Sequence, residues 1–527
     1  MVFIFPFSLS FFCLISFPLN VISLPSSFLP LLLPLELSSF SQILGTYIST
    51  HTHPLHLHTY YLHTYICNRS STDEPNIVAG DDDTEPDQGN VLSHIISQLR
   101  PGADLSRVVL PTFILEPRSM LERITNFMAH PETLLPMPTV DDPLERFVSV
   151  VKFYLSGWHI KPPGVKKPLN PILGETFTGY WKYPDGTYGY YIAEQTSHHP
   201  PKSSYFFMAP EHNIRIDGTL IPRSKFLGNS AGSMMEGIAI LRFMNRGSNK
   251  EKGERYILTQ PNMYARNILI GKMKYELGDH SYVRCPENNL VADIEFKTKG
   301  YFSGTYNQIG GTIKNSETNE VYYELSGLWN QEMYITDVKT HKKELLFDAT
   351  KAKPTPPSVR PIEQQGERES QRLWQSTVKG ILDRNHDVAT DEKTKIEDRQ
   401  REEAAKRTSE GVEWHPRLFR RVQGGPGGPD EGEEDLDWII NAQINPHDPQ
   451  LAAKQILSIA PILEGQSESS QFQIPPHKRE HEDAPSDQNG AGPSADQPPP
   501  SGGEPLEEVQ RKDTRTSDVD TFVDAKP

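Results

Sequence analysis

Apolar residues first recur with helical spacing in a segment that begins near residue 90. Positions three and four residues apart predict helices over residues 118–128 and 142–155. In the second segment Asp142 precedes Pro143. This pair is typical of a helix start, because aspartate accepts a hydrogen bond from a free backbone amide and proline needs no donor there. We therefore expect the folded part of the chain to open with helices.

Beyond the second helix the spacing becomes that of β-strands. Short runs rich in β-branched and aromatic residues are separated by turn residues such as Asp185-Gly186. The predicted strands cover residues 188–192, 214–220, 238–243, 291–296, 321–329 and 345–347. A series of this length without intervening helices is typical of an antiparallel sheet that closes, and a large closed sheet encloses a cavity. We predict an α+β fold, a large antiparallel β-barrel finished by helices over residues 367–383 and 391–407.

The two ends of the chain differ from this middle part. Residues 1–70 are apolar and then His-rich, with no charge in the first 35 positions, and prolines interrupt any spanning helix. We interpret them as unassigned, either a mis-assigned start or an anchor. Residues 71–89 are expected to be an acidic linker, 90–425 the folded domain, and 426–527 a disordered acidic tail rich in Pro and Gly. Within the tail, residues 448–461 could form a short amphipathic helix or a coil.

Charge and cysteine content limit the function classes. The formal net charge is −16 and the isoelectric point is about 5.6, which argues against nucleic acid as a partner. Cys13, Cys67 and Cys285 are too few for a disulfide framework in a chain of 527 residues. The chain is therefore expected in a reducing compartment, the cytoplasm.

The segment Glu194-Gln-Thr-Ser-His-His-Pro-Pro201 carries the most specific chemistry of the chain. Its two prolines remove two amide donors and favour an extended path, so His198 and His199 are expected on a stiff rim. Paired imidazoles on such a rim suit an anion. A metal site would need a third ligand, which the nearby sequence does not offer, and we expect neither a metal nor a cofactor.

This octapeptide resembles the signature of the oxysterol-binding-protein family of lipid-transfer proteins. Further blocks at residues 166–175, 225–230 and 304–310 resemble the same family, as do the three charged residues Lys393, Glu397 and Arg401 at positions i, i+4 and i+8 of a helix. The similarity extends over about residues 90 to 420. It implies a lipid tunnel inside the barrel with an N-terminal lid, and a phosphatidylinositol 4-phosphate site made of Lys167, Leu169, Asn170, His198, His199, Lys393, Glu397 and Arg401. We expect Glu397, one helical turn from each cation, to orient both.

The segment at residues 105–115 resembles the phosphatidylserine-exchanging branch of the family. That resemblance implies contacts of phosphatidylserine with Leu110, Ile114, Lys167, Asn170 and Ser224. The expected function is exchange of phosphatidylserine for phosphatidylinositol 4-phosphate, by transient membrane contact, between the endoplasmic reticulum and the plasma membrane. A sterol in place of phosphatidylserine, and a phosphoinositide sensor without transport, remain alternatives.

An enzyme is the third class of function to consider. Gly228-Asn-Ser-Ala-Gly232 matches the nucleophile elbow of esterases, with Ser230 as the nominal nucleophile. The elbow needs a strand before the serine and a helix after it, whereas the following residues are rich in strand formers. A serine lipid hydrolase is therefore not expected.

The last residues contain a candidate docking peptide. Thr521-Phe-Val-Asp-Ala-Lys526 follows an acidic stretch and resembles the motif by which many lipid-transfer proteins bind receptors of the endoplasmic reticulum. Phe522 would fill an apolar pocket of the receptor, and Asp524 and Ala525 would match the positions that follow.

Overall fold

The computed structural model describes residues 100–105, 110–270, 272–300, 304–423 and 436–466. The predictions for residues 1–70 and 71–89, and those for Phe522, Asp524 and Ala525, lie outside this range.

Short helical segments precede the sheet, as the apolar spacing predicted. They comprise η2 (Thr112–Ile114), α3 (Met120–Arg123), η3 (Ile124–Met128), α4 (Pro131–Leu134), η4 (Met137–Thr139) and α5 (Pro143–Ser156), and the short strand β1 (Leu115–Ser119) lies between η2 and α3. Asp142 caps α5, since its Oδ1 accepts hydrogen bonds from the amides of Leu144 and Glu145, each at 2.9 Å. The helix predicted over 118–128 is only partly right, because Arg118 and Ser119 belong to β1 and the helix changes to 3-10 form at Ile124.

Strand β2 (Lys167–Leu169) pairs in parallel with β1. The strands that follow form one antiparallel sheet. They are β3 (Thr176–Lys182), β4 (Tyr188–His198), β5 (Pro201–Ala209), β6 (Ile214–Phe226), β7 (Ser230–Glu236), β8 (Ala239–Phe243), β9 (Glu254–Leu258), β10 (Asn262–Arg266), β11 (Lys274–Cys285), β12 (Leu290–Lys297), β13 (Gln308–Asn315), β14 (Val321–Leu328), β15 (Glu332–Asp337) and β16 (Lys343–Asp348). All six predicted runs are strands. The strands between them were missed.

Closure of the sheet depends on two long strands. The first half of β6 pairs with β8 and its second half with β7, while β11 pairs with β10 at one end and with β9 at the other. Strands β7 and β10 pair with each other, as do β8 and β9, so six strands form a closed circuit. The outer strands β3 and β16 do not pair with each other in the described part of the chain. The antiparallel fold with flanking helices is confirmed, and its closure runs through this circuit.

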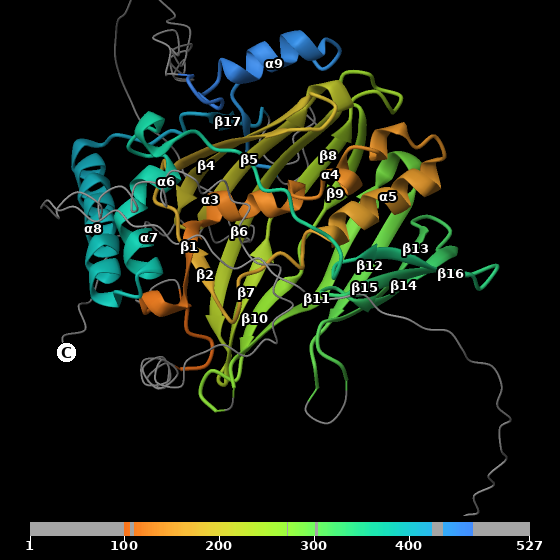
Figure 1. Ribbon diagram of the computed structural model, residues 1–527, viewed down its shortest axis with the longest axis horizontal. Helices are drawn as coiled ribbons and strands as arrows, with labels where there is room; N and C mark the ends of the chain where they lie inside the picture. Colours follow the sequence, from red (N-terminus) through yellow and green to blue (C-terminus); the bar gives the residue numbers. More distant parts are fainter. Residues whose placement is uncertain (1–99, 106–109, 271, 301–303, 424–435, 467–527) are drawn as a thin grey trace, which may run out of the picture. The chain divides into compact units, whose positions relative to one another are not determined.

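The largest apolar core lies between the helical segments and one face of the sheet (Figure 1). Helix α5 contributes Phe147, Val150, Val151 and Tyr154, all at most 1% exposed. The helix is also fixed by a two-pronged ion pair in which Arg146 Nε and Nη2 donate to the carboxylate of Glu254 in β9, each at 2.8 Å. Packing and this ion pair together hold α5 against the sheet.

Two helices follow the sheet and carry part of the predicted site. After η7 (Ile362–Gln364) and α6 (Ser370–Leu373) come α7 (Gln375–Leu382) and α8 (His386–Glu410). The predicted helix over 367–383 is interrupted at Trp374, and the predicted helix over 391–407 is longer at both ends. Helix α8 packs closely on α7, because a Cβ at Gly380 would lie 2.8 Å from the amide nitrogen of Ala389.

The expectation of a disordered tail from residue 426 is wrong for residues 436–466. Strands β17 (Phe419–Arg421) and β18 (Trp438–Ile440) pair, and α9 (Pro449–Leu457) follows. Their apolar side chains cover the outer face of β4 and β5. Figure 1 shows α9 beside these strands. The polar composition of the tail concealed the short apolar run at Trp438, and the uncovered apolar face of the sheet supplies its partner.

Candidate functional site

The two histidines of the octapeptide lie where β4 turns into β5. His198 ends β4, Pro201 begins β5, and the bond between His199 and Pro200 is cis. The two imidazole rings are 4.6 Å apart between centroids and meet edge to face. His199 is exposed and His198 is partly buried. The predicted rim is therefore present, with one accessible imidazole and one held in the protein.

His198 is held by a residue that the sequence analysis did not identify. Its Nε2 lies 2.8 Å from Nε2 of Gln400 in α8. Burial, and next the neighbouring His199, lower the pKa of His198 to about 4, against the opposing effect of the Pro171 carbonyl. Gln400 follows Lys393 and Glu397 at the spacing of one helix face (i, i+4, i+7), and this spacing is the signal that could have revealed it.

The basic residues of the predicted site come together from two elements. Lys167 lies in β2, and Lys393 lies in α8, where its Nζ is 2.6 Å from Oε1 of Glu397. The pKa of Lys167 is lowered, first by burial and then by the charge of Lys393, with Asp104 and Glu397 acting against the shift. Two lysines that repel each other in a partly buried place form a site that favours an anion.

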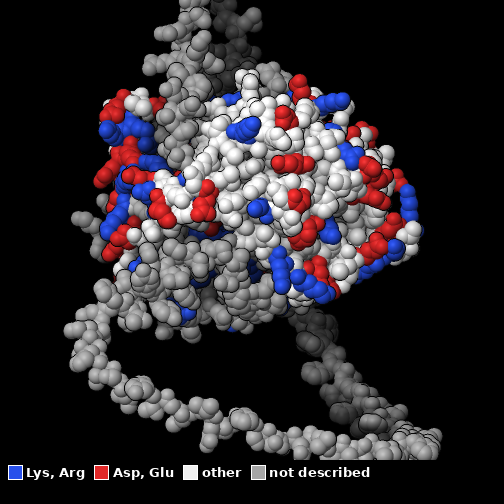
Figure 2. All heavy atoms as spheres, turned by 45° about the horizontal axis from the view of Figure 1, so that its top comes forward, with Lys and Arg blue, Asp and Glu red and all other residues white. Residues whose placement is uncertain are grey.

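Other predicted residues have different positions. Leu169 is fully buried in a cluster with Ile172 and Trp374, so it anchors β2 in the apolar core. Asn170 is exposed. Arg401 is 48% exposed and pairs with Asp398. The expectation that Glu397 orients both cations is therefore wrong in this state, since Glu397 pairs with Lys393 while Arg401 has another partner. Figure 2 shows acidic and basic side chains intermixed on the side where α8 lies in Figure 1.

The predicted lid residues pack over the ends of two strands. Leu110 and Ile114 contact an apolar cluster formed by Leu105, Phe226 and Ile268. Backbone hydrogen bonds join Gly102 and Ala103 to Phe226, so the residues just before the lid segment lie along the end of β6. Ser224 lies opposite Ser233 in the pairing of β6 with β7, two residues before Phe226 and so on the same side of the strand.

The lid segment also touches the basic residues. Lys166 Nζ donates to the carbonyl of Phe113, and Leu115 in β1 pairs with Lys167 in β2. Thr112 Oγ1 donates to the carbonyl of His386 at the start of α8, at 3.3 Å. The apolar lid and the cationic site are therefore neighbours.

Two buried glutamates of the signature blocks have structural roles. Glu175 accepts hydrogen bonds from Ser119 Oγ, Ser370 Oγ (2.7 Å) and Trp374 Nε1 (2.9 Å). Glu194 accepts hydrogen bonds from the amides of Arg417 and Leu418, each at 2.7 Å, next to β17. Burial raises the pKa of Glu194 to about 7 in spite of these donors. Both carboxylates join the signature strands to later parts of the chain.

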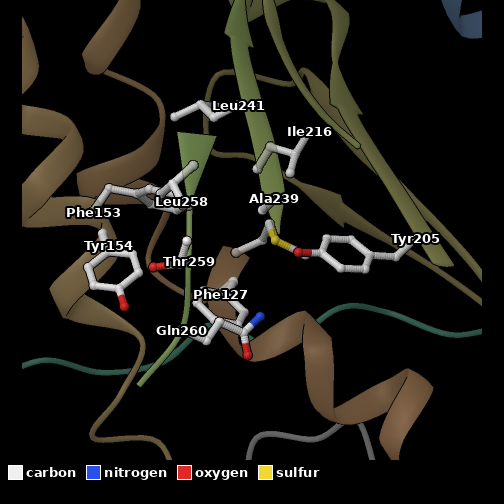
Figure 3. Close-up of a pocket in the computed structure, with 11 residues that line it drawn as sticks. Phe127, Phe153, Tyr154, Tyr205, Ile216, Ala239, Leu241, Leu258, Thr259 and Gln260 are labelled. Atoms are coloured by element: carbon white, nitrogen blue, oxygen red, sulfur yellow. The ribbon is translucent and has the colours of Figure 1, made fainter. Parts of the chain in front are cut away.

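An apolar cavity lies between α5 and the sheet (Figure 3). Its wall includes Phe127, Tyr154, Tyr205, Ile216 and Leu258, and the space inside is about 370 Å³ with its open side included. The interior therefore offers apolar surface with little free volume in this state.

Ser230 does not have the geometry of a catalytic serine. Ser230 begins β7. The preceding strand, β6, ends at Phe226 and pairs antiparallel with β7. The match at residues 228–232 is thus a strand–turn–strand hairpin, whereas a nucleophile elbow needs a strand followed by a helix.

Within the described ranges no three His, Cys, Asp or Glu side chains are grouped so that they could hold a metal ion. None of the helices in these ranges is both long enough and apolar enough to cross a membrane.

The large antiparallel sheet with flanking helices is a lipid-binding fold, and comparison with known proteins gives its family. The family model described as oxysterol-binding protein matches residues 94–382 and 378–447. The chain therefore belongs to the oxysterol-binding protein family.

Similar proteins support this assignment. Oxysterol-binding protein homolog 6 of Saccharomyces cerevisiae is 51% identical over 412 residues, which cover 77% of this chain and 90% of the relative. Oxysterol-binding protein homolog 7 of the same yeast is 53% identical over 396 residues, covering 74% and 88%. Among solved structures, the Osh1 ORD domain in complex with cholesterol aligns with a TM-score of 0.55 at 21% identity, covering 71% of this chain and 91% of that chain. This last similarity shows the fold alone.

Proposed function

We propose that this chain exchanges phosphatidylserine for phosphatidylinositol 4-phosphate. The observation that carries the proposal is the pair of mutually repelling lysines, Lys167 and Lys393, next to the lid segment, with His198 held by Gln400 on the same helix α8 that carries Lys393. A phosphorylated head group carries nearly two negative charges and needs charge-assisted donors once it leaves water. The lysines and the accessible imidazole of His199 are groups of that kind.

The apolar lid suits the acyl chains of a lipid. Two acyl chains contain about 30 methylene groups, and each exposed methylene costs about 0.8 kcal/mol, so extraction into water would cost more than about 20 kcal/mol. Leu110 and Ile114, beside Ser224, provide an apolar cover with a small polar group near it. We infer that the chain carries lipid without catalysing a reaction, at contacts between endoplasmic reticulum and plasma membrane, and that Phe522, Asp524 and Ala525 bind a receptor there.

A sterol is the second candidate for the exchanged lipid. The Osh1 domain with the same fold was solved with cholesterol, and the cavity of Figure 3 has a mostly apolar wall. This alternative keeps the phosphoinositide site and changes only the second lipid.

The test is a lipid-extraction assay with the purified full chain. Vesicles containing phosphatidylinositol 4-phosphate, phosphatidylserine or ergosterol are incubated with the protein, and the lipid in the soluble fraction is measured. We expect extraction of the first two lipids. His198→Ala with His199→Ala should abolish extraction of the phosphoinositide, and stability should change little because the pair lies on the rim.

The control replaces His447, an exposed histidine next to α9, by alanine and should behave as wild type. Extraction of the phosphoinositide by the double variant at wild-type level would overturn the site. Extraction of ergosterol in place of phosphatidylserine would assign the chain to the sterol alternative.

A further inference from the structure

Helix α8 is attached to the rest of the protein by very few buried side chains. Of its 25 residues only Ala389 and Gln400 are buried. Ala389 packs on α7, and Ile396 adds a partly buried apolar contact. Gln400, 8% exposed, is the one buried polar residue of the helix in this part of the structure, and it lies on the turn between Glu397 and Arg401.

The amide of Gln400 joins two other segments. Its Oε1 accepts a hydrogen bond from the amide of Leu173 at 2.7 Å. Its Nε2 lies 2.8 Å from Nε2 of His198. A backbone amide can only donate, so the contact with Leu173 fixes which end of the side-chain amide is oxygen, and the NH₂ group must face the histidine.

This orientation determines the protonation of His198. An NH₂ group only donates, so Nε2 of His198 must be the acceptor and carries no proton. The neutral ring then keeps its proton on Nδ1, which is buried, has no hydrogen-bond partner of normal geometry in the described residues, and is influenced by the Pro171 carbonyl. The other titratable group acting on the ring is His199. In this state the only N–H of the His198 ring is the buried Nδ1–H, and Nε2 offers no donor to an anion.

We propose that Gln400 is a latch that competes with the phosphate of the head group for Nε2 of His198. A phosphate oxygen can accept from this nitrogen only when the nitrogen carries a proton and Gln400 has moved away. The latch thus holds His198 neutral while the site is empty, and it favours return to that state when the ligand leaves. Gln400 is a positioning residue that acts through His198, and the phosphate part of this inference rests on the proposed function.

Two substitutions separate the latch from a purely structural role. Gln400→Glu is isosteric and keeps an acceptor for the Leu173 amide, but it presents an acceptor in place of a donor to His198. Gln400→Met removes both hydrogen bonds and leaves Nε2 of His198 free. A structural role predicts that the methionine variant binds anions more weakly, because α8 loses an anchor. The latch predicts that it binds them more tightly, by about 2- to 10-fold, the range expected for the loss of one competing hydrogen bond.

The experiment uses the full chain labelled with ¹⁵N-histidine, and the ring signals of His198 are assigned with the His198→Ala variant. Without ligand at pH 7, wild type should show Nε2 without a proton, and Gln400→Glu should show Nε2 protonated. Binding is then followed with inorganic phosphate and with vesicles containing phosphatidylinositol 4-phosphate.

The outcomes are distinct. Tighter phosphate binding by Gln400→Met, with the two ring states above, supports the latch. A protonated Nε2 in the wild type, an unchanged ring in Gln400→Glu, or equal or weaker binding by Gln400→Met would overturn it, as would the absence of phosphate binding by every variant. If phosphate binds but the phosphoinositide is not extracted, the proposed function fails while the latch stands.

Discussion

At the scale of single residues, buried polar groups determine how the site is built. Glu194 begins the histidine-containing octapeptide, yet its carboxylate points to the amides of Arg417 and Leu418 and contributes to the fold. A buried carboxylate with a raised pKa favours the folded state when it is protonated, and its ionisation lowers the free energy of unfolding. The docking of the segment after α8 should therefore depend on pH.

We expect Glu194→Gln to remove a pH-dependent part of the stability. The pKa of Glu194 is about 7 in the folded chain and near 4.5 in the unfolded chain, so the folded state binds the proton more tightly. Its stabilising effect is complete below about pH 4.5 and is lost as pH rises through 7, a difference of roughly 3 kcal/mol. The free energy of unfolding, measured from pH 5 to 8, should fall more steeply in wild type than in Glu194→Gln.

Comparison between variants is needed because other groups titrate as well. The lowered pKa of His198 acts in the opposite sense, since protonation of the ring between about pH 6.5 and 4 destabilises the fold. Glu363→Gln, at an exposed glutamate, is the matched control and should leave the wild-type curve unchanged. Parallel curves for wild type and Glu194→Gln would show that Glu194 is ionised without cost.

At the scale of elements, two hairpin tips form one exposed apolar unit. Leu227 between β6 and β7 is 45% exposed, and Ile270 between β10 and β11 is 79% exposed. Asn229 joins the tips, because its Oδ1 accepts from the amides of Leu269 and Ile270, each at 2.9 Å. The exposed Lys225, near the end of β6, and the exposed Lys272, between β10 and β11, lie close to these tips in sequence. Apolar tips with basic neighbours suit an anionic membrane surface.

We expect Leu227→Ser with Ile270→Ser to weaken binding to vesicles that contain anionic lipid by about tenfold. Insertion of two aliphatic side chains contributes at most about 1.5–3 kcal/mol each, and partial insertion contributes less. Co-sedimentation with the vesicles measures the effect. Leu345→Ser is the control, since Leu345 in β16 is 52% exposed and lies away from these tips in sequence and in the sheet. An equal loss in the control would indicate general surface apolarity as the cause.

At the scale of the whole molecule, the segment after α8 covers one face of the sheet. Tyr190, Ile192, Phe206 and Met208 point to the outer face of β4 and β5, where β18 and α9 cover them. Thr178 Oγ1 donates to the carbonyl of Pro461 at 2.9 Å, and Lys202 pairs with Asp437. The segment packs on β4, the strand that ends in His198, and so supports the rim formed by His198 and His199.

A truncation series tests this role. A chain that stops after residue 466 should keep wild-type stability and lipid extraction, whereas a chain that stops after residue 423 should lose both, because several large apolar side chains become exposed. Thermal unfolding and the extraction assay measure the two effects. Wild-type stability in the shorter chain would show that β18 and α9 add no support, and loss of extraction in the longer chain would assign a role to residues beyond 466.

Much of the fold followed from patterns that neighbouring residues set by themselves. The cap at Asp142, the strand at residues 291–296 and the rim formed by His198 and His199 depend on side chains within a few positions of each other. Such local preferences are visible in a single sequence because the same short segment both carries the signal and adopts the structure.

The tertiary structure decided what distant segments do together. The contact between Gln400 and His198 joins residues 202 positions apart, and the pairing of Arg401 with Asp398 in place of Glu397 depends on how α8 lies on the protein. The bends of β6 and β11 close the sheet through six strands, and the apolar face of β4 and β5 orders residues that composition alone marked as disordered. In each case the deciding free energy comes from burial and hydrogen bonds between segments far apart in the chain, which local sequence patterns do not contain.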